Sequence, residues 1–126
     1  MEIITKTSGG SVGDVVGRLE DLIASRGLKL FAVIDHSGEA RRAGLELRET
    51  TVVLFGSPAA GTPVMAASPL AALDLPLKVL VWDHDGQTNV SYTDPAALAA
   101  RYELGPELAE RLAGINGLTD ALTAGG

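Results

Sequence analysis

Residues 52–92 place the strongest constraint on how this chain can fold. Residues 50–55 (TTVVLF) are rich in β-branched side chains and predict a strand. Residues 78–83 and 87–92 predict two more strands, and the Asp-Gly pair between them favours a type I′ hairpin turn. We therefore expect a sheet that is mostly antiparallel.

The segment between these strands, residues 56–76, is dense in Gly, Pro, Ser and Thr. It predicts a long loop that holds a short helix around residues 64–67 or 69–73. Long connections between buried strands often carry function, and glycine lets a backbone approach a ligand closely. Ser57 and Thr62 add hydroxyl groups. The glycine spacing matches neither a phosphate-binding P-loop nor a nucleophile elbow.

The N-terminal part of the chain predicts a strand followed by a helix. Residues 2–7 are rich in Ile and Thr and favour a strand. Ser11 and Asp14 then have the spacing of a capping box, and Gly27 is expected to end the helix. The apolar repeat of this helix consists of Val12, Val15, Val16, Leu19, Leu22 and Ile23.

The remaining elements complete an alternation of strands and helices. Residues 28–35 (LKLFAVID) predict a second strand, and residues 39–44 a helical turn, after which Leu45 and Leu47 could open another strand. An Asp-Pro pair at residues 94–95 begins a helix, and a final amphipathic helix runs to about residue 122. The order predicts a two-layer α+β sandwich with a mostly antiparallel sheet and helices on one face.

Composition narrows the class of function. The chain has 126 residues and 46% hydrophobic residues, which fits one domain over residues 1–126. Its net charge is −6 and its basic residues are scattered, so we expect neither a nucleic-acid partner nor an anionic membrane surface. The lack of cysteine excludes disulfides and thiolate catalysis. No apolar stretch is long enough for a membrane helix and no secretory signal is visible, so a cytoplasmic location is expected.

His36 is the first candidate catalytic residue. It follows an apolar strand and Asp35, where an imidazole could act as a general acid or base or as a metal ligand. The alternative is a histidine that hydrogen-bonds to nearby backbone. His84 lies on the shoulder of the predicted hairpin, where it is expected to be solvated. No spacing pattern joins the two histidines, so no metal site is predicted.

Asp74 lies in the Leu-Asp-Leu-Pro sequence that closes the predicted loop. A carboxylate at this place is expected to brace the loop or cap a helix, and the alternative is an acid within a site. Neither the two histidines nor Asp74 identifies a cofactor.

Three sequence blocks and a later tyrosine resemble the domain of unknown function 302 family. The blocks are FAVIDH at residues 31–36, FGSPAAGT at 55–62 and LDLPLKV at 73–79, followed by Tyr92. The resemblance covers nearly the whole chain in matching order and spacing. It implies a β-α-β-β-β-β-α unit like that of the TATA-box-binding-protein superfold, and a homodimer. It implies no activity, because the family has none assigned, and fold alone does not carry DNA binding to an acidic chain.

The chain departs from the family pattern in one loop. The family commonly has Phe-Gly-Asn-Pro-Lys followed shortly by Gly-Thr, whereas Ser57 and Ala59 replace the Asn and the Lys here. A binding mode that required this lysine to meet an anion would lack it in this chain.

We therefore predict a small soluble domain that acts as a small-molecule binding or accessory module. Its pocket is expected where the strand end at His36 meets the loop at residues 56–62. The expected ligand-binding residues are His36, Gly56, Ser57, Pro58, Gly61, Thr62 and Asp74. One alternative is an enzyme that uses His36 as general acid or base, oriented by Asp35 or Asp74. Another is a structural or protein-interaction module whose loop forms a homodimer contact.

Overall fold

Five antiparallel strands form a single sheet in the computed structural model, which describes residues 2–124. The strands are β1 (Ile3–Ser8), β2 (Lys29–Asp35), β3 (Thr50–Gly56), β4 (Leu77–His84) and β5 (Gln87–Thr93). Their spatial order is β1-β5-β4-β3-β2, and every neighbouring pair runs antiparallel. The predicted α+β class and sheet type are confirmed.

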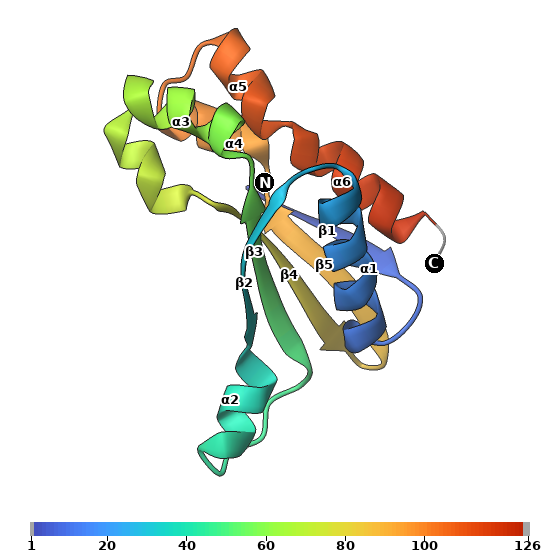
Figure 1. Cartoon of the computed structure of the whole chain (residues 1–126). Helices are drawn as coiled ribbons and strands as arrows, with labels where there is room; N and C mark the ends of the chain where they lie inside the picture. The colour runs from blue at the N-terminus through green and yellow to red at the C-terminus, as the bar shows by residue number, and fades with distance from the viewer. Residues whose placement is uncertain (1, 125–126) are drawn as a thin grey trace.

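Two helices, α1 (Val12–Ser25) and α6 (Gly114–Thr123), pack against one face of the sheet (Figure 1). At the upper end in this view lie α3, α4 and α5, whereas α2 lies at the opposite end, beyond β2 and β3. The bounds of the shorter helices are α2 His36–Arg42, α3 Pro58–Ala67, α4 Pro95–Arg101 and α5 Pro106–Leu112, with a 3-10 helix, η1, at Pro69–Asp74. Among residues 2–124, no helix combines the length and the apolar character needed to cross a membrane.

The core lies between the helices and the three strands β3, β4 and β5. Alternate residues of these strands point toward the helices, as the two-residue period of a strand requires. The core members from the strands are Val53, Phe55, Val79, Val81, Val90 and Tyr92, and those from the helices are Val12, Val15, Leu19, Ile23, Ile115, Leu118 and Leu122. Lys6 of β1 also joins the C-terminal helix, donating to Thr119 Oγ1 and Asp120 Oδ1 at 2.7 Å each.

The local signals in the sequence form as predicted. Both hydrogen bonds of the capping box are present between Ser11 and Asp14. Asp85 and Gly86 both have positive φ, 49° and 88°, as a type I′ turn requires. Asp94 caps α4, whose first residue is a proline.

Three expectations for loops and helix ends were wrong. Residues 56–76 are not a long loop, because Ser57 caps a helix that begins at Pro58 and runs to Ala67. The short helical segments expected around residues 64–67 and 69–73 are present, within α3 and η1. Leu45 and Leu47 open no strand and are 65% and 45% exposed. The final helix is divided at Ala113, where amides at positions 113 and 116 bond to carbonyls three residues earlier and tighten the turn.

Strand β2 lies at the edge of the sheet with side chains exposed on both faces. Its four large apolar residues, Leu30, Phe31, Val33 and Ile34, are 40%, 46%, 40% and 38% exposed. A bulge interrupts its pairing with β3 between Leu30 and Ala32. This strand therefore presents an apolar surface and one unpaired backbone edge.

Candidate ligand-binding cavity

The predicted meeting of His36 with the loop at residues 56–62 does not occur. Because β2 and β3 are antiparallel, Lys29 pairs with Gly56 at one end of the ladder and Asp35 pairs with Thr51 at the other. A strand rises about 3.3 Å per residue, so the six steps of β2 separate the two places by roughly 20 Å. The prediction of a pocket between His36 and this loop was therefore wrong.

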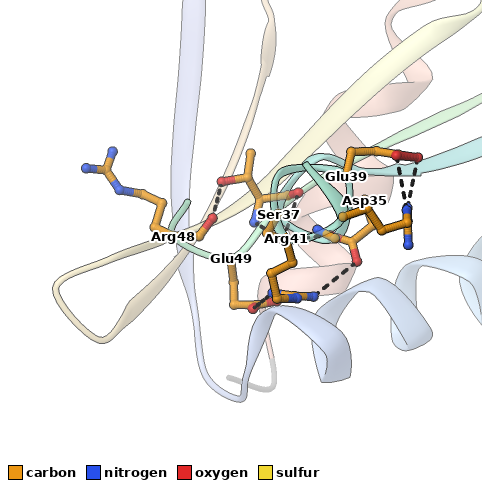
Figure 2. Close-up of polar contacts among 9 residues, drawn as sticks. Asp35, Ser37, Glu39, Arg41, Arg48 and Glu49 are labelled. Atoms are coloured by element: carbon orange, nitrogen blue, oxygen red, sulfur yellow. Dashed lines mark hydrogen bonds and ion pairs between the residues drawn. The ribbon is translucent and has the colours of Figure 1, made fainter. Parts of the chain in front are cut away.

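The end of the sheet near His36 is a polar brace for α2 (Figure 2). Asp35 caps this helix, accepting from Gly38 N at 2.9 Å and from Ser37 Oγ at 2.6 Å. The hydrogen bond from Ser37, and then that from the Gly38 amide, lower the pKa of Asp35. The fully buried Ser37 Oγ also accepts from Thr50 N at 3.1 Å, which ties α2 to β3.

His36 lacks the neighbours that acid–base catalysis needs. Its side chain is exposed and forms no hydrogen bond or ion pair within the described part of the chain. The carboxylate of Asp35 is occupied by the cap, and Asp74 belongs to η1, near the other end of the sheet. Nor do three His, Asp or Glu side chains within residues 2–124 gather as a metal would require.

A cavity of about 400 Å³ lies at the opposite end of the sheet, beside α3. Four of the predicted ligand-binding residues line it: Gly56, Ser57, Pro58 and Gly61. His36, Thr62 and Asp74 do not. The rest of the wall is largely apolar, and its larger members include Phe31, Phe55, Met65, Leu75, Leu112 and Leu118.

Glycines at positions 56 and 61 leave space in the wall of this cavity. Ser57 Oγ accepts from Ala60 N at 3.3 Å and starts α3 directly after β3. A Cβ placed on Gly56 would lie 3.8 Å from the Phe31 ring. One placed on Gly61 would lie 3.9 Å from Leu75 Cδ1 and 4.0 Å from Met65 Cε. Both glycines thus leave room that longer side chains would fill.

Two arginines, Arg26 and Arg111, are the charged residues of the lining, which contains no carboxylate. Both are exposed, and neither guanidinium has a polar partner among residues 2–124. Sequence reasoning missed them because they come from the end of α1 and the last turn of α5, far from the loop signal. No motif in the chain joins these positions to Gly56.

Asp74 acts as a brace, the first of the two roles considered from sequence. It accepts hydrogen bonds from the Tyr102 hydroxyl and from Arg101 Nη1, the latter at 2.9 Å. Arg101 also pairs with Glu2 at 2.6 Å. The hydrogen bond from Tyr102, together with Arg101, lowers the pKa of Asp74. These contacts join η1 to α4, and Asp74 borders a separate cavity of only about 30 Å³.

The fold and cavity define an α+β domain with an apolar site at one end of an antiparallel sheet. The chain belongs to the family described as "Domain of unknown function DUF302", whose model matches residues 4–122. A crystal structure of an uncharacterized conserved DUF302 protein from Bacillus stearothermophilus has a TM-score of 0.83. It is 20% identical and the match covers 98% of this chain and 97% of that one, which supports the fold alone.

Curated relatives are longer proteins. A protein of Brucella suis biovar 1 (strain 1330) named "Fluoride-specific ion channel FluC 1" is 36% identical over 104 residues, or 82% of this chain and 41% of the relative. "Fluoride-specific ion channel FluC 2" of Brucella melitensis biotype 1 shows the same identity over 38% of its length. This chain therefore spans about two fifths of the relatives it matches.

Replacement of Ser37 by Ala should destabilise the α2 end of the molecule. The change leaves the half-buried Thr50 amide without its acceptor; a fully buried unsatisfied amide costs about 1–3 kcal/mol, so a loss near the lower end, about 1 kcal/mol, is expected. Urea denaturation and hydrogen exchange of the Thr50 amide would measure this loss. Ser25→Ala is the control, since Ser25 is exposed and donates only to Leu22 O. Equal stability and equal Thr50 exchange in both variants would contradict the brace.

Loss of the Tyr102 hydroxyl should change the acid sensitivity of the fold. The pKa of Asp74 lies below its ordinary value of 3.8, so its ionised form stabilises the fold above that pH, and this contribution disappears as pH falls through the folded pKa. In Tyr102→Phe the pKa of Asp74 should rise toward 3.8 and the acid-dependent loss should shrink.

NMR titration of the Asp74 carboxyl, with urea denaturation between about pH 2 and pH 6, would test this expectation. Tyr92→Phe is the matched control, because its hydroxyl donates to Asn116 Oδ1 at 2.7 Å instead. An unchanged Asp74 pKa in Tyr102→Phe would contradict the assignment.

Proposed function

We propose that this domain is a small-molecule binding module and that the cavity beside α3 is its site. The observation that carries the proposal is a largely apolar cavity of about 400 Å³ with few polar groups. Ligand sites in proteins commonly range over roughly 300–1,000 Å³ and have this mixture of lining. The volume corresponds to roughly a dozen water-sized atoms, since a water molecule takes about 30 Å³ in the liquid.

The lining favours binding over proton-transfer chemistry. Its charged side chains are arginines, and the lining holds no histidine or carboxylate that could act as a general acid or base. Ser57, the hydroxyl-bearing residue of the wall, is used as a helix cap. The arrangement therefore supports recognition of a ligand more than its conversion.

The accessory role receives support from the curated relatives. In the Brucella proteins named fluoride-specific ion channels, more than half of the length lies outside the region that matches this chain. A domain of this kind is there one part of a larger polypeptide. A ligand-binding module is a suitable component of such an arrangement, because it adds a site without adding a reaction.

We also propose that two copies of the chain associate through β2. Its exposed apolar side chains and free edge suit the addition of a further strand. In an antiparallel pair of two β2 strands centred on Ala32, Lys29 of one copy would face Asp35 of the other. Leu30 would face Ile34, and Phe31 would face Val33. The strand is thus complementary to itself in charge and in apolar character.

Filling the cavity should abolish binding of 1-octanol, a neutral apolar probe of suitable size. A Gly61→Leu side chain would project toward Leu75 and Met65, so affinity should fall by about tenfold or more. NMR shifts of the Gly56 and Gly114 amides during titration would measure it.

Two variants control this experiment. Gly17→Leu places the same side chain on α1, where a Cβ on Gly17 would have no neighbour within 4 Å, and should leave binding intact. Gly61→Ala adds only a methyl group in ordinary contact and should stabilise α3 by about 1 kcal/mol. Failure of octanol to shift the lining amides of the wild type would overturn the proposed site.

A charge placed on the edge strand should dissociate the proposed dimer. In Val33→Lys two lysines would enter one apolar interface, and burial of the 40% of each valine that is exposed is worth only roughly 0.6–1.2 kcal/mol, so the charge dominates the effect. Sedimentation velocity should show a dimeric wild type and a monomeric variant. Leu70→Lys, at a 68% exposed position of η1, should remain dimeric. A monomeric wild type would contradict the assembly.

A further inference from the structure

We propose that the ligand of the cavity is a medium-chain alkyl carboxylate whose head group is held by Arg26 and Arg111. The inference rests on the proposed function, because it names the chemical class of molecule that the same cavity would bind. It depends on the placement of two guanidinium groups at an otherwise apolar wall.

Both arginines lie where helix ends meet at one side of the cavity. Arg26 is the C-cap of α1, and its Nη1 atom would lie 4.0 Å from a Cβ built on Gly117 of α6. Arg111 lies in the last turn of α5, three residues before the first residue of α6. The two arginines therefore come from neighbouring helix ends, and both line the cavity, as do Gly114 and Ile115 of α6.

The use of the other arginines makes this pair distinctive. Arg41, Arg42 and Arg101 form ion pairs with carboxylates. Arg18 donates to Ser8 Oγ and to Gly9 O. Within residues 2–124, the side chains of Arg26, Arg48 and Arg111 have no such partner, and of these three only Arg26 and Arg111 line the cavity. A group supplied by a ligand would complete their hydrogen bonds.

The charge of the cavity is opposite to that of the chain. The whole sequence carries a net charge of −6, whereas the lining carries two positive groups and no acidic side chain. A guanidinium matches a carboxylate through paired, charge-assisted hydrogen bonds. A cationic head group would meet like charges, and a neutral alcohol would leave the guanidiniums paired only with water.

The apolar remainder of the cavity fits an unbranched chain of moderate length. Phe31, Phe55, Met65 and Leu75 provide aromatic and flexible aliphatic contacts. The volume admits roughly a dozen non-hydrogen atoms by the same comparison with water. Octanoate, with eight carbons and two oxygens, satisfies both the volume and the head group.

The experiment compares octanoate, 1-octanol and octylammonium as ligands of the wild type at pH 7, using the shifts of lining amides. The double variant Arg26→Gln/Arg111→Gln and the control Arg48→Gln are titrated in parallel. Arg48 is exposed and lies outside the lining, so it tests whether any surface arginine would have the same effect.

The wild type and Arg48→Gln should bind octanoate about fivefold or more tightly than octanol, with octylammonium weakest. The double variant should lose the preference, so that octanoate and octanol bind it with similar affinities. Added NaCl should weaken octanoate binding and spare octanol.

Two different failures can be distinguished. If octanol binds and octanoate binds no more tightly, or if the preference survives in the double variant, the assignment of a carboxylate is wrong and the apolar site stands. If none of the three probes shifts the lining amides, both the site and the assignment are overturned.

Discussion

Burial of one face of the sheet by only two helices determines much of this structure. Packed helices lie about 8–10 Å apart and neighbouring strands about 4.8 Å apart, so a pair of helices covers about four strands. The sheet has five. Helices α1 and α6 share a core with β3, β4 and β5, and α6 also holds β1 through Lys6. The two helices do not cover strand β2 of the five-stranded sheet, and its side chains are therefore exposed.

The cavity arises at the place where helices end and do not pack side by side. The cavity is bordered by the C-cap of α1, the last residue of α5 and the first residues of α3 and α6, which are Arg26, Leu112, Pro58 and Gly114. Helix ends have no continuous ridges with which to fill the space between them. Phe55 and Gly56, the last residues of β3, also line the cavity, and the result is a largely apolar wall with charges near helix termini.

Sequence alone predicted the elements whose signals are local. The capping box at Ser11, the Asp-Gly turn and the Asp-Pro helix start depend on neighbours within a few residues, and all three form. The helix α3 was misjudged because its glycines and prolines are typical of loops. Pro58 occupies the first helical residue, where it lacks no needed hydrogen bond, whereas Pro63 lies inside the helix, which nonetheless continues to Ala67.

The candidate site was predicted only in part because its members are joined by the fold and not by spacing. Gly56 to Gly61 form one short segment that the loop signal identified. His36 was assigned to it because it ends an apolar strand beside a turn and lies in a block that resembles the family, yet the register of β2 and β3 decides where that end lies. Arg26 and Arg111 are 85 residues apart in number, and no periodicity connects them.

Phe31 belongs to two surfaces at once, since it borders the cavity and lies in the exposed edge strand. Any change in its rotamer on ligand binding would alter the surface offered to a second copy. Thermodynamic linkage then requires that association with a second copy change ligand affinity by the same free energy by which the ligand changes association. In the proposed dimer, the affinity of the cavity for the proposed ligand would depend on protein concentration, because the Phe31 ring would couple occupancy of the cavity to assembly.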